Sequence, residues 1–181
     1  EEDLRSPCTQ EVAVFRAFAR EIGTARRQFV VMDTAPTGHT LLLLDTTGSY
    51  HREVLRTSEM EAGEITTPLM RLQDPAYTKM LLVTLPETTP VLEAKDLQAD
   101  LQRAGITPYG WVVNQSLAAA EPSDPLLVQR AHAEKRQIEA VQDEHAERTA
   151  LVPWMPEEPT GTKRLQALSR GSISPHRLAD V

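Results

Sequence analysis

Four short apolar runs, each continuous rather than alternating with polar residues, are the feature that most constrains the fold of this chain. They are rich in valine and leucine and occupy residues 29–32, 80–83, 109–113 and 150–152. Continuous runs of this length are typical of strands that are buried on both faces of a parallel sheet. Strands that alternate with helical stretches predict an α/β fold, here a three-layer sandwich with a mostly parallel sheet and right-handed crossovers.

Helical spacing and capping residues mark the stretches between these runs. Apolar residues repeat three and four positions apart at Ala94, Leu97, Leu101 and Ala104, and likewise at Phe15, Phe18, Ala19 and Ile22. Such a stripe predicts a helix with one face against the sheet. Ser6-Pro7 and Thr89-Pro90 each place a capping side chain before a proline, as at the start of a helix.

Three segments interrupt this regularity. Residues 57–75 mix glycine, threonine and proline, and we expect a mobile insertion there. Residues 118–125 predict a polar loop before a charged helix that runs from about Leu126 to Arg148. Few core residues follow position 170, so the sequence predicts one partial domain over residues 1–169 and a disordered tail over 170–181.

Composition narrows the class of protein and its compartment. The 181 residues are 40% hydrophobic and 25% charged, as expected of one soluble domain. A net charge of −7 without a basic cluster argues against nucleic-acid binding, and no run approaches the roughly 20 apolar residues of a transmembrane helix. The single cysteine fits the cytoplasm. Because the chain starts at Glu1 within domain-like sequence, we expect a fragment or a trimmed N-terminus.

The segment after the first apolar run is the strongest candidate for chemistry. It reads Asp-Thr-Ala-Pro-Thr-Gly-His-Thr at residues 33–40. Ligands of an open parallel sheet bind outside the carboxyl ends of its strands, which is where Asp33 would lie. A carboxylate there can hold Mg²⁺, directly or through water, beside nucleotide phosphates. The alternative is that Asp33 only caps the next helix and that Gly38 only serves a turn.

This string resembles the signature of the arsenical pump-driving ATPases, an anion-transporting family with the P-loop NTPase fold. The resemblance continues through Leu-Leu-Val-Thr-Leu-Pro-Glu-Thr-Thr-Pro at residues 81–90 and Glu-Pro-Thr-Gly at residues 158–161. It covers nearly the whole chain and is strongest to the C-terminal half of the two-halved bacterial pump subunit. It implies an ATPase in which Asp33 acts catalytically, in a switch linked to Mg²⁺ and ATP.

The resemblance also implies half of a binding site for arsenite or antimonite. The segment around Ser6 and Cys8 resembles the family segment whose cysteine and serine contact metalloid, and His39 is the third contributor. Trivalent arsenic and antimony prefer sulfur ligands, and a helix N-terminus would stabilise the thiolate of Cys8. From the residues alone, a small buried cysteine and a hydrogen-bonded histidine are the alternatives. The remaining thiols would come from the N-terminal half of the same ATPase.

A phosphate-binding loop of the type Gly-x-x-x-x-Gly-Lys-[Ser/Thr] does not occur in the 181 residues. The fold would therefore lack its N-terminal P-loop unit, and we expect this chain alone to be inactive. Asn114 ends the third predicted strand, directly after its apolar run, and can pair with an adenine edge through its amide. The resemblance assigns Asn114 and Pro153 to nucleotide binding; a turn-forming asparagine and a strand-terminating proline are the alternatives. We expect His51, His132, His145 and His176 on surfaces, and Trp111 and Trp154 in packing.

The resemblance further implies a membrane arsenite permease as partner and a cytoplasmic location at the inner face of the membrane. One rival is the tail-anchored-protein targeting ATPase, a relative of the same fold that carries a zinc-binding Cys-x-x-Cys after the asparagine. Residues 114–130 contain no cysteine. The other rival is a non-catalytic regulatory module of this fold.

Overall fold

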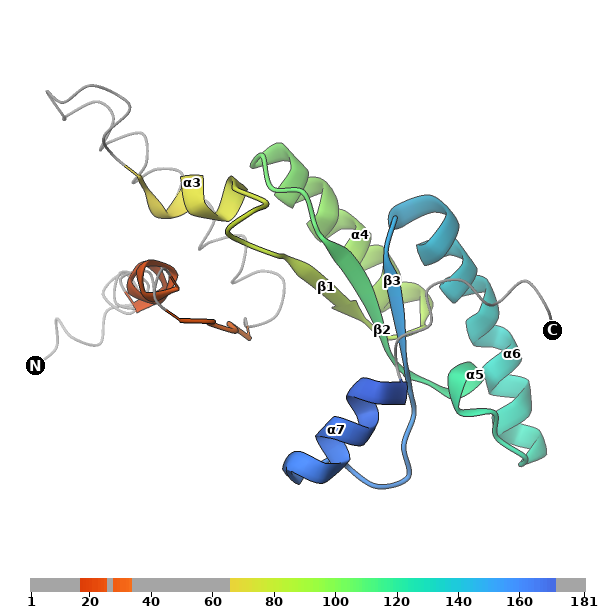
Figure 1. Ribbon diagram of the computed structural model, residues 1–181. Helices are drawn as coiled ribbons and strands as arrows, with labels where there is room; N and C mark the ends of the chain where they lie inside the picture. Colours follow the sequence, from red (N-terminus) through yellow and green to blue (C-terminus); the bar gives the residue numbers. More distant parts are fainter. Residues whose placement is uncertain (1–16, 26–27, 34–65, 172–181) are drawn as a thin grey trace, which may run out of the picture. The chain divides into compact units, whose positions relative to one another are not determined.

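The structure, a computed structural model, describes residues 17–25, 28–33 and 66–171. These residues fall into two compact units, which we describe one at a time (Figure 1). The first unit contains residues 17–25, 28–33, 66–78 and 103–106, and the second contains residues 79–102 and 107–171.

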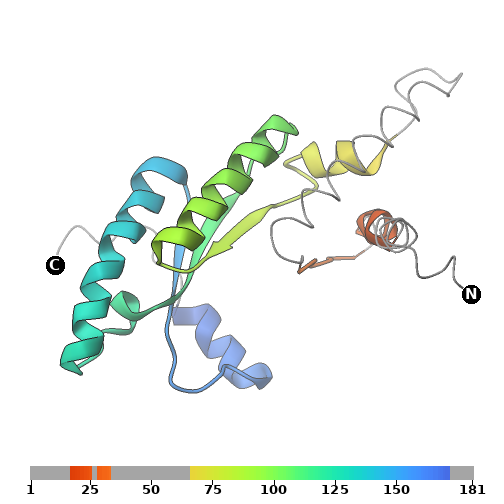
Figure 2. The ribbon, with the colours of Figure 1, turned by 180° about the vertical axis from the view of Figure 1, so that it is seen from behind.

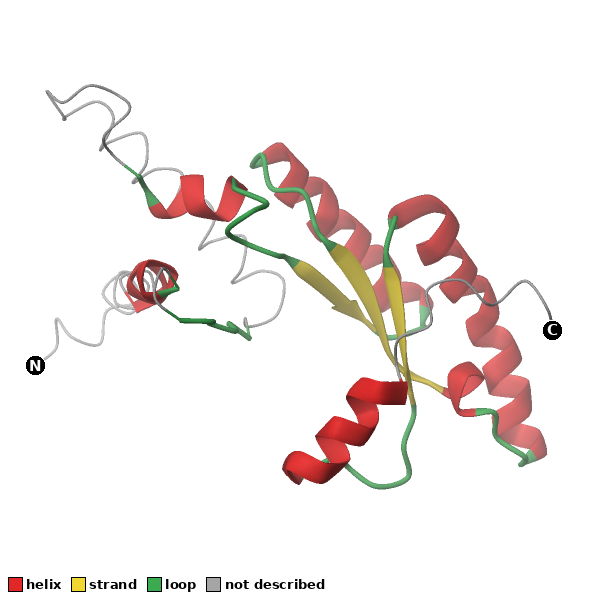
Figure 3. Ribbon diagram, viewed as in Figure 1, coloured by secondary structure: helices red, strands yellow, loops and turns green. Residues whose placement is uncertain are grey.

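The second unit is built on a parallel sheet. In the described part of the chain this sheet has three strands in the order β1-β2-β3. They are β1 (Leu81–Thr84), β2 (Gly110–Ser116) and β3 (Thr149–Pro153). Leu82 pairs with Trp111, and Val112 pairs with Ala150. Three of the four predicted strands and the parallel α/β architecture are thereby confirmed (Figure 3).

Two long helices connect the strands and lie on the same face of the sheet, as both opposite views show (Figures 1 and 2). They are α4 (Thr88–Arg103) and α6 (Pro125–Ala140), and a π-helical turn η2 (Val141–His145) continues α6. The predicted stripe on α4 is confirmed, because Ala94 and Leu101 are buried. The helix begins at Thr88, two residues before the proline expected at its start, since proline is tolerated anywhere in the first turn.

The core of this unit lies between the sheet and the two helices. Trp111, Val113, Leu101 and Ile138 are 0–2% exposed. The Trp111 indole donates a hydrogen bond to Gln98 Oε1 at 2.6 Å and stacks on the His145 ring, with 5.7 Å between centroids. His145 was predicted to lie on the surface, and this prediction is wrong: the residue is half-buried because the π-helical turn directs its ring onto the indole.

The segments predicted to be irregular contain short helices. Pro68–Gln73 forms α3, capped by Thr67, whose hydroxyl accepts a hydrogen bond from Met70 N at 3.4 Å. Leu117–Ala120 forms α5, so only the residues from 121 to 124 remain a loop before α6. The last helix, α7 (Gly161–Gly171), runs two residues into the segment expected to be disordered; residues 172–181 lie outside the described residues.

The prediction of a strand at residues 29–32 is wrong. These residues pair with no strand among the residues described, and the Phe29 and Val31 side chains are 93% and 78% exposed. A strand exists only through its ladder of hydrogen bonds to a neighbour, and an apolar run alone does not supply one.

Side-chain hydrogen bonds tie together the described part of the first unit. Residues 17–24 are helical, and Ile22 is buried on the predicted apolar stripe. The Tyr77 hydroxyl donates to Ile22 O at 2.5 Å, and Gln73 Nε2 donates to Ala104 O at 2.8 Å. Gly105 adopts φ +75°, a left-handed conformation that favours glycine. In neither unit do the described residues include a helix long and apolar enough to span a membrane.

Candidate functional site at the carboxyl ends of the strands

An irregularity at the carboxyl end of β2 sets the direction of Asn114. The ladder pairs Val113 with Leu151 and resumes with Ser116 opposite Pro153. Two residues of β2, Asn114 and Gln115, therefore oppose one residue of β3, which defines a β-bulge. Gln115 has φ 56°, in the left-handed region that residues with a side chain seldom adopt. Bulges re-aim the side chains beside them, so this one determines where the half-buried Asn114 amide points.

Buried polar groups hold the residue that follows the bulge. Ser116 is fully buried, and its hydroxyl donates to Glu134 Oε2 at 3.2 Å. The same hydroxyl accepts a hydrogen bond from Ala119 N at 3.1 Å and so caps α5. The Ser116 carbonyl accepts from Trp154 N at 2.9 Å. This end of β2 is therefore fixed to α5, to α6 and to the residue that follows β3.

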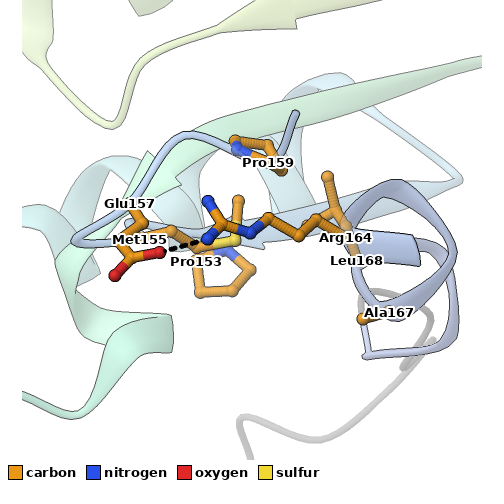
Figure 4. A pocket seen from close by; sticks show the side chains of 7 residues that line it. All are labelled: Pro153, Met155, Glu157, Pro159, Arg164, Ala167 and Leu168. Carbon is orange, nitrogen blue, oxygen red and sulfur yellow. Dashed lines mark ion pairs between the residues drawn. The ribbon is translucent and has the colours of Figure 1, made fainter. Parts of the chain in front are cut away.

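A cavity of about 310 Å³ opens where β3 ends (Figure 4). Its walls are mostly apolar, and a salt bridge crosses it. The lining residues are Pro153, Met155, Glu157, Pro159, Arg164, Ala167 and Leu168. Arg164 of α7 reaches across to the loop that follows β3, where it contacts Glu157 Oε2 at 2.6 Å and donates to Glu158 O at 3.2 Å. We call this space the β3 cavity.

A smaller space of about 210 Å³ lies beside α6, near the ends of β1 and β2. Its polar lining comes from Glu87, Gln115, Arg130 and Glu134, and Trp154 forms part of its rim. Arg130 Nη2 contacts Glu87 Oε1 at 3.1 Å, and both side chains are more than half exposed. An ion pair this exposed contributes little stability.

The structure places three of the predicted site residues. Asn114 and Pro153 lie on neighbouring strands at the same end of the sheet. Pro153 lines the β3 cavity, whereas Asn114 is not among the residues that line either space. Asp33 is exposed and belongs to the first unit. Ser6, Cys8 and His39 lie outside the described residues, so their roles stay predictions.

Two residues of this region were missed from the sequence. Glu134 is buried in the stripe of α6 that also contains Ala131 and Ile138. The sequence did contain a signal for its burial: Glu134 lies three positions after Ala131 and four positions before Ile138, which is the spacing of one helix face. Arg164 carries no such signal, because its position matters only once α7 folds back toward the loop after β3. Among the residues described, no group of three or more His, Cys, Asp or Glu side chains gathers to hold a metal ion.

These features define a class: an open parallel α/β sheet of the P-loop NTPase type, with its polar residues and its cavities at the carboxyl ends of the strands. The comparison with known families agrees. The family described as "Anion-transporting ATPase" matches residues 1–71 and 44–172. The chain belongs to the anion-transporting ATPase family.

Individual relatives show how much of a family member this chain represents. It is 63% identical over 168 residues to the arsenical pump-driving ATPase of Acidiphilium multivorum, and 63% identical over 168 residues to one from Escherichia coli. Each match covers 93% of this chain but 29% of the relative's length. A more distant relative is the ATPase GET3A of Arabidopsis thaliana, 22% identical over 94% of this chain and 58% of its own length.

Proposed function

We propose that this chain is part of an ATPase that drives the efflux of arsenite or antimonite, and that it supplies the adenine end of a nucleotide site. Family membership and the 63% identity to arsenical pump-driving ATPases support the parent activity. The bulge at Asn114 and the β3 cavity at Pro153 support the nucleotide role. The polar amide and the apolar cavity lie at the same end of adjacent strands, and this observation carries the proposal.

The β3 cavity suits a nucleotide base in size and in chemistry. Its volume of about 310 Å³ is at the lower end of the roughly 300–1,000 Å³ of small-molecule sites. Pro153, Met155 and Leu168 offer apolar surface to the faces of a planar ring. Asn114 does not line the cavity but lies on the neighbouring strand at the same end of the sheet. Its amide carries one acceptor and two donors, which would match the N6 donor and N1 acceptor of an adenine that extends beyond the cavity.

Asp33 and the loop that follows it would serve the phosphate end of the nucleotide. Mg²⁺ commonly binds proteins through one or two carboxylates while it keeps several waters, so one exposed aspartate fits that chemistry. When bound, Mg²⁺ would neutralise phosphate charge. In this proposal the chain would hold the ion through Asp33. The proline and glycine at positions 36 and 38 would let the loop change its conformation when the γ-phosphate is present or absent.

Ser6, Cys8 and His39 would form half of the metalloid site. A single thiol offers arsenic one soft ligand, so other thiols must come from the rest of the parent ATPase. ATP hydrolysis likewise needs a phosphate-binding loop from outside these 181 residues, and we expect the isolated chain to be inactive. In this proposal the parent acts in the cytoplasm, together with a membrane permease at the inner face of the membrane.

Nucleotide binding by the parent ATPase tests the role of Asn114. Asn114→Ala should weaken ATP binding about five- to tenfold, because that factor corresponds to the net free energy of the hydrogen bonds that the amide would lose. Gln129→Ala is a matched control, because Gln129 is an exposed amide on α6, and it should leave the dissociation constant unchanged. Calorimetric titration measures both variants. Equal affinities of Asn114→Ala and the unmodified ATPase would remove Asn114 from the site.

Metal content separates the proposal from its nearest rival. A tail-anchored-protein targeting ATPase with a zinc site would hold zinc stoichiometrically, whereas the proposed pump ATPase needs none. Elemental analysis of the purified parent decides between them. The higher identity to the arsenical pump-driving ATPases and the lack of cysteine in residues 114–130 favour the pump.

A further inference from the structure

The buried carboxylate of Glu134 has no role in the function proposed so far. Glu134 is 6% exposed and lies on α6 between the buried residues Ala131 and Ile138. Burial of a carboxylate is unfavourable unless hydrogen bonds replace its lost hydration. An alanine or a leucine would continue the apolar stripe without that cost, so the contacts of the carboxylate must explain its presence.

One oxygen of Glu134 makes those contacts. Oε2 accepts hydrogen bonds from the Ser116 hydroxyl at 3.2 Å and from Ala118 N at 3.1 Å. Both donors lie just beyond the bulge, one at the last residue of β2 and one in α5. The carboxylate therefore fastens the chain that leaves β2 to α6.

The bulge needs such a fastening. Gln115 occupies the left-handed region at φ 56°, and a strained conformation of this kind persists only where the surrounding structure fixes it. Beyond the bulge, the Ser116 carbonyl accepts from Trp154 N at 2.9 Å, which ties the same point to the end of β3. Without the carboxylate, Ser116 would lose its tie to α6, and Asn114 lies only two residues earlier.

We infer that Glu134 is a positioning residue for base recognition, because it holds Ser116 and Ala118, fixes the bulge and thereby fixes the Asn114 amide. This inference rests on the proposed role of Asn114. The amide distinguishes adenine from hypoxanthine only while its oxygen faces the N6 donor and its NH2 group faces the N1 acceptor, so a displaced backbone at the bulge would lose both contacts. Discrimination between these bases requires a fixed amide, whereas affinity for the triphosphate does not.

The test compares ATP with inosine triphosphate on the parent ATPase. Dissociation constants for both nucleotides are measured by calorimetry for the unmodified protein, Glu134→Ala, Glu134→Gln and Asn114→Ala. We expect Glu134→Ala to lose most of the preference for ATP, about five- to tenfold, as Asn114→Ala does. Glu134→Gln keeps an acceptor oxygen and should keep most of the preference. Glu139→Ala, at an exposed acid on the same helix, should change nothing.

The outcomes separate this inference from the function on which it rests. If Asn114→Ala keeps the preference for ATP, the assignment of Asn114 is wrong, and the inference falls with it. If Asn114→Ala loses the preference while Glu134→Ala weakens both nucleotides equally, only the inference is wrong. Should Glu134→Ala not fold, Ser116→Ala decides, since it removes one of the two donors: a reduced preference supports positioning, and an unchanged preference overturns it.

Discussion

At the scale of single residues, Trp111 shows how the core of the second unit depends on polar as well as apolar contacts. Its indole is buried, stacks on His145 and donates to Gln98, while Gln98 Nε2 donates to His145 O at 3.0 Å. The three side chains therefore form one connected group that joins α4, β2 and η2. Removal of the indole N–H leaves an acceptor without its donor.

Trp111→Phe should lower the free energy of unfolding of the chain by about 1–3 kcal/mol, because Gln98 Oε1 loses its hydrogen bond from the indole and the smaller ring leaves a void in the core. Urea denaturation followed by circular dichroism measures this change. Trp154→Phe is the matched control: Trp154 is 43% exposed, so its replacement should change stability by less than about 0.5 kcal/mol. Equal losses in both variants would contradict the role of the hydrogen-bonded group.

At Gly110 the sheet leaves no room for a side chain. A Cβ at this first position of β2 would lie 2.8 Å from the Arg148 carbonyl oxygen, which accepts from Trp111 N in the adjacent hydrogen bond. Gly110→Ala should therefore destabilise the chain by about 1–3 kcal/mol through overpacking against backbone.

The control for Gly110 is Gly23→Ala in the helix of residues 17–24, where the nearest atom to an added Cβ is the end of the Arg71 side chain at 3.4 Å. Alanine favours a helix over glycine, so this change should be neutral or stabilise by about 0.5–1 kcal/mol. Thermal unfolding of the two variants should move in opposite directions. If Gly23→Ala were destabilised and Gly110→Ala were unaffected, the claim that Gly110 has no room for a side chain would be contradicted.

At the scale of elements, the start of α6 depends on its cap. The Asp124 carboxylate accepts hydrogen bonds from Leu126 N at 2.9 Å and Leu127 N at 3.2 Å, and Pro125 occupies the first helical position. Asp124→Ala should cost about 0.5–2 kcal/mol, whereas Asp124→Asn retains the acceptor and should cost almost nothing. Chemical denaturation checks both. An asparagine variant as unstable as the alanine variant would show that charge, and not the hydrogen bond, stabilises this end.

The elements that the sequence predicted well are those with both a periodic pattern and a partner in the second unit. Three apolar runs became strands β1, β2 and β3, and the stripe of Ala94 and Leu101 became the buried side of α4. The run at residues 29–32 is equally apolar, yet it is not a strand among the described residues. Apolar composition states that a segment prefers burial; which neighbour it pairs with depends on long-range contacts that no local pattern contains.

The candidate site was predictable only in part, for a related reason. Asn114 and Pro153 follow apolar runs, so their place at the carboxyl ends of strands could be inferred from order alone. The bulge at Gln115 and the buried Glu134 could not, because each depends on contacts between β2, β3 and α6. The sequence thus predicted which residues lie at the carboxyl ends of the strands, and the structure identified the groups that hold these residues in position.

At the scale of the whole molecule, the proposed function requires communication between a nucleotide and a metalloid. Asp33 and His39 lie six positions apart on one segment, the string at residues 33–40. If that segment moves when the γ-phosphate is present, the same movement displaces His39, and coupling between the two sites needs no further element. Binding coupling of this kind is reciprocal, so metalloid should also tighten ATP binding.

This coupling predicts different effects of two substitutions in the parent ATPase. His39→Ala should weaken the stimulation of ATP turnover by antimonite about tenfold and spare basal turnover, since coupling free energies are typically about 1–3 kcal/mol. In the proposed role Asp33 holds Mg²⁺ at the phosphates, so Asp33→Asn should depress both basal and stimulated turnover. A phosphate-release assay with and without antimonite measures all four rates. Equal loss of basal and stimulated turnover in His39→Ala would place this histidine with the phosphates and would leave the metalloid signal without a route through the segment.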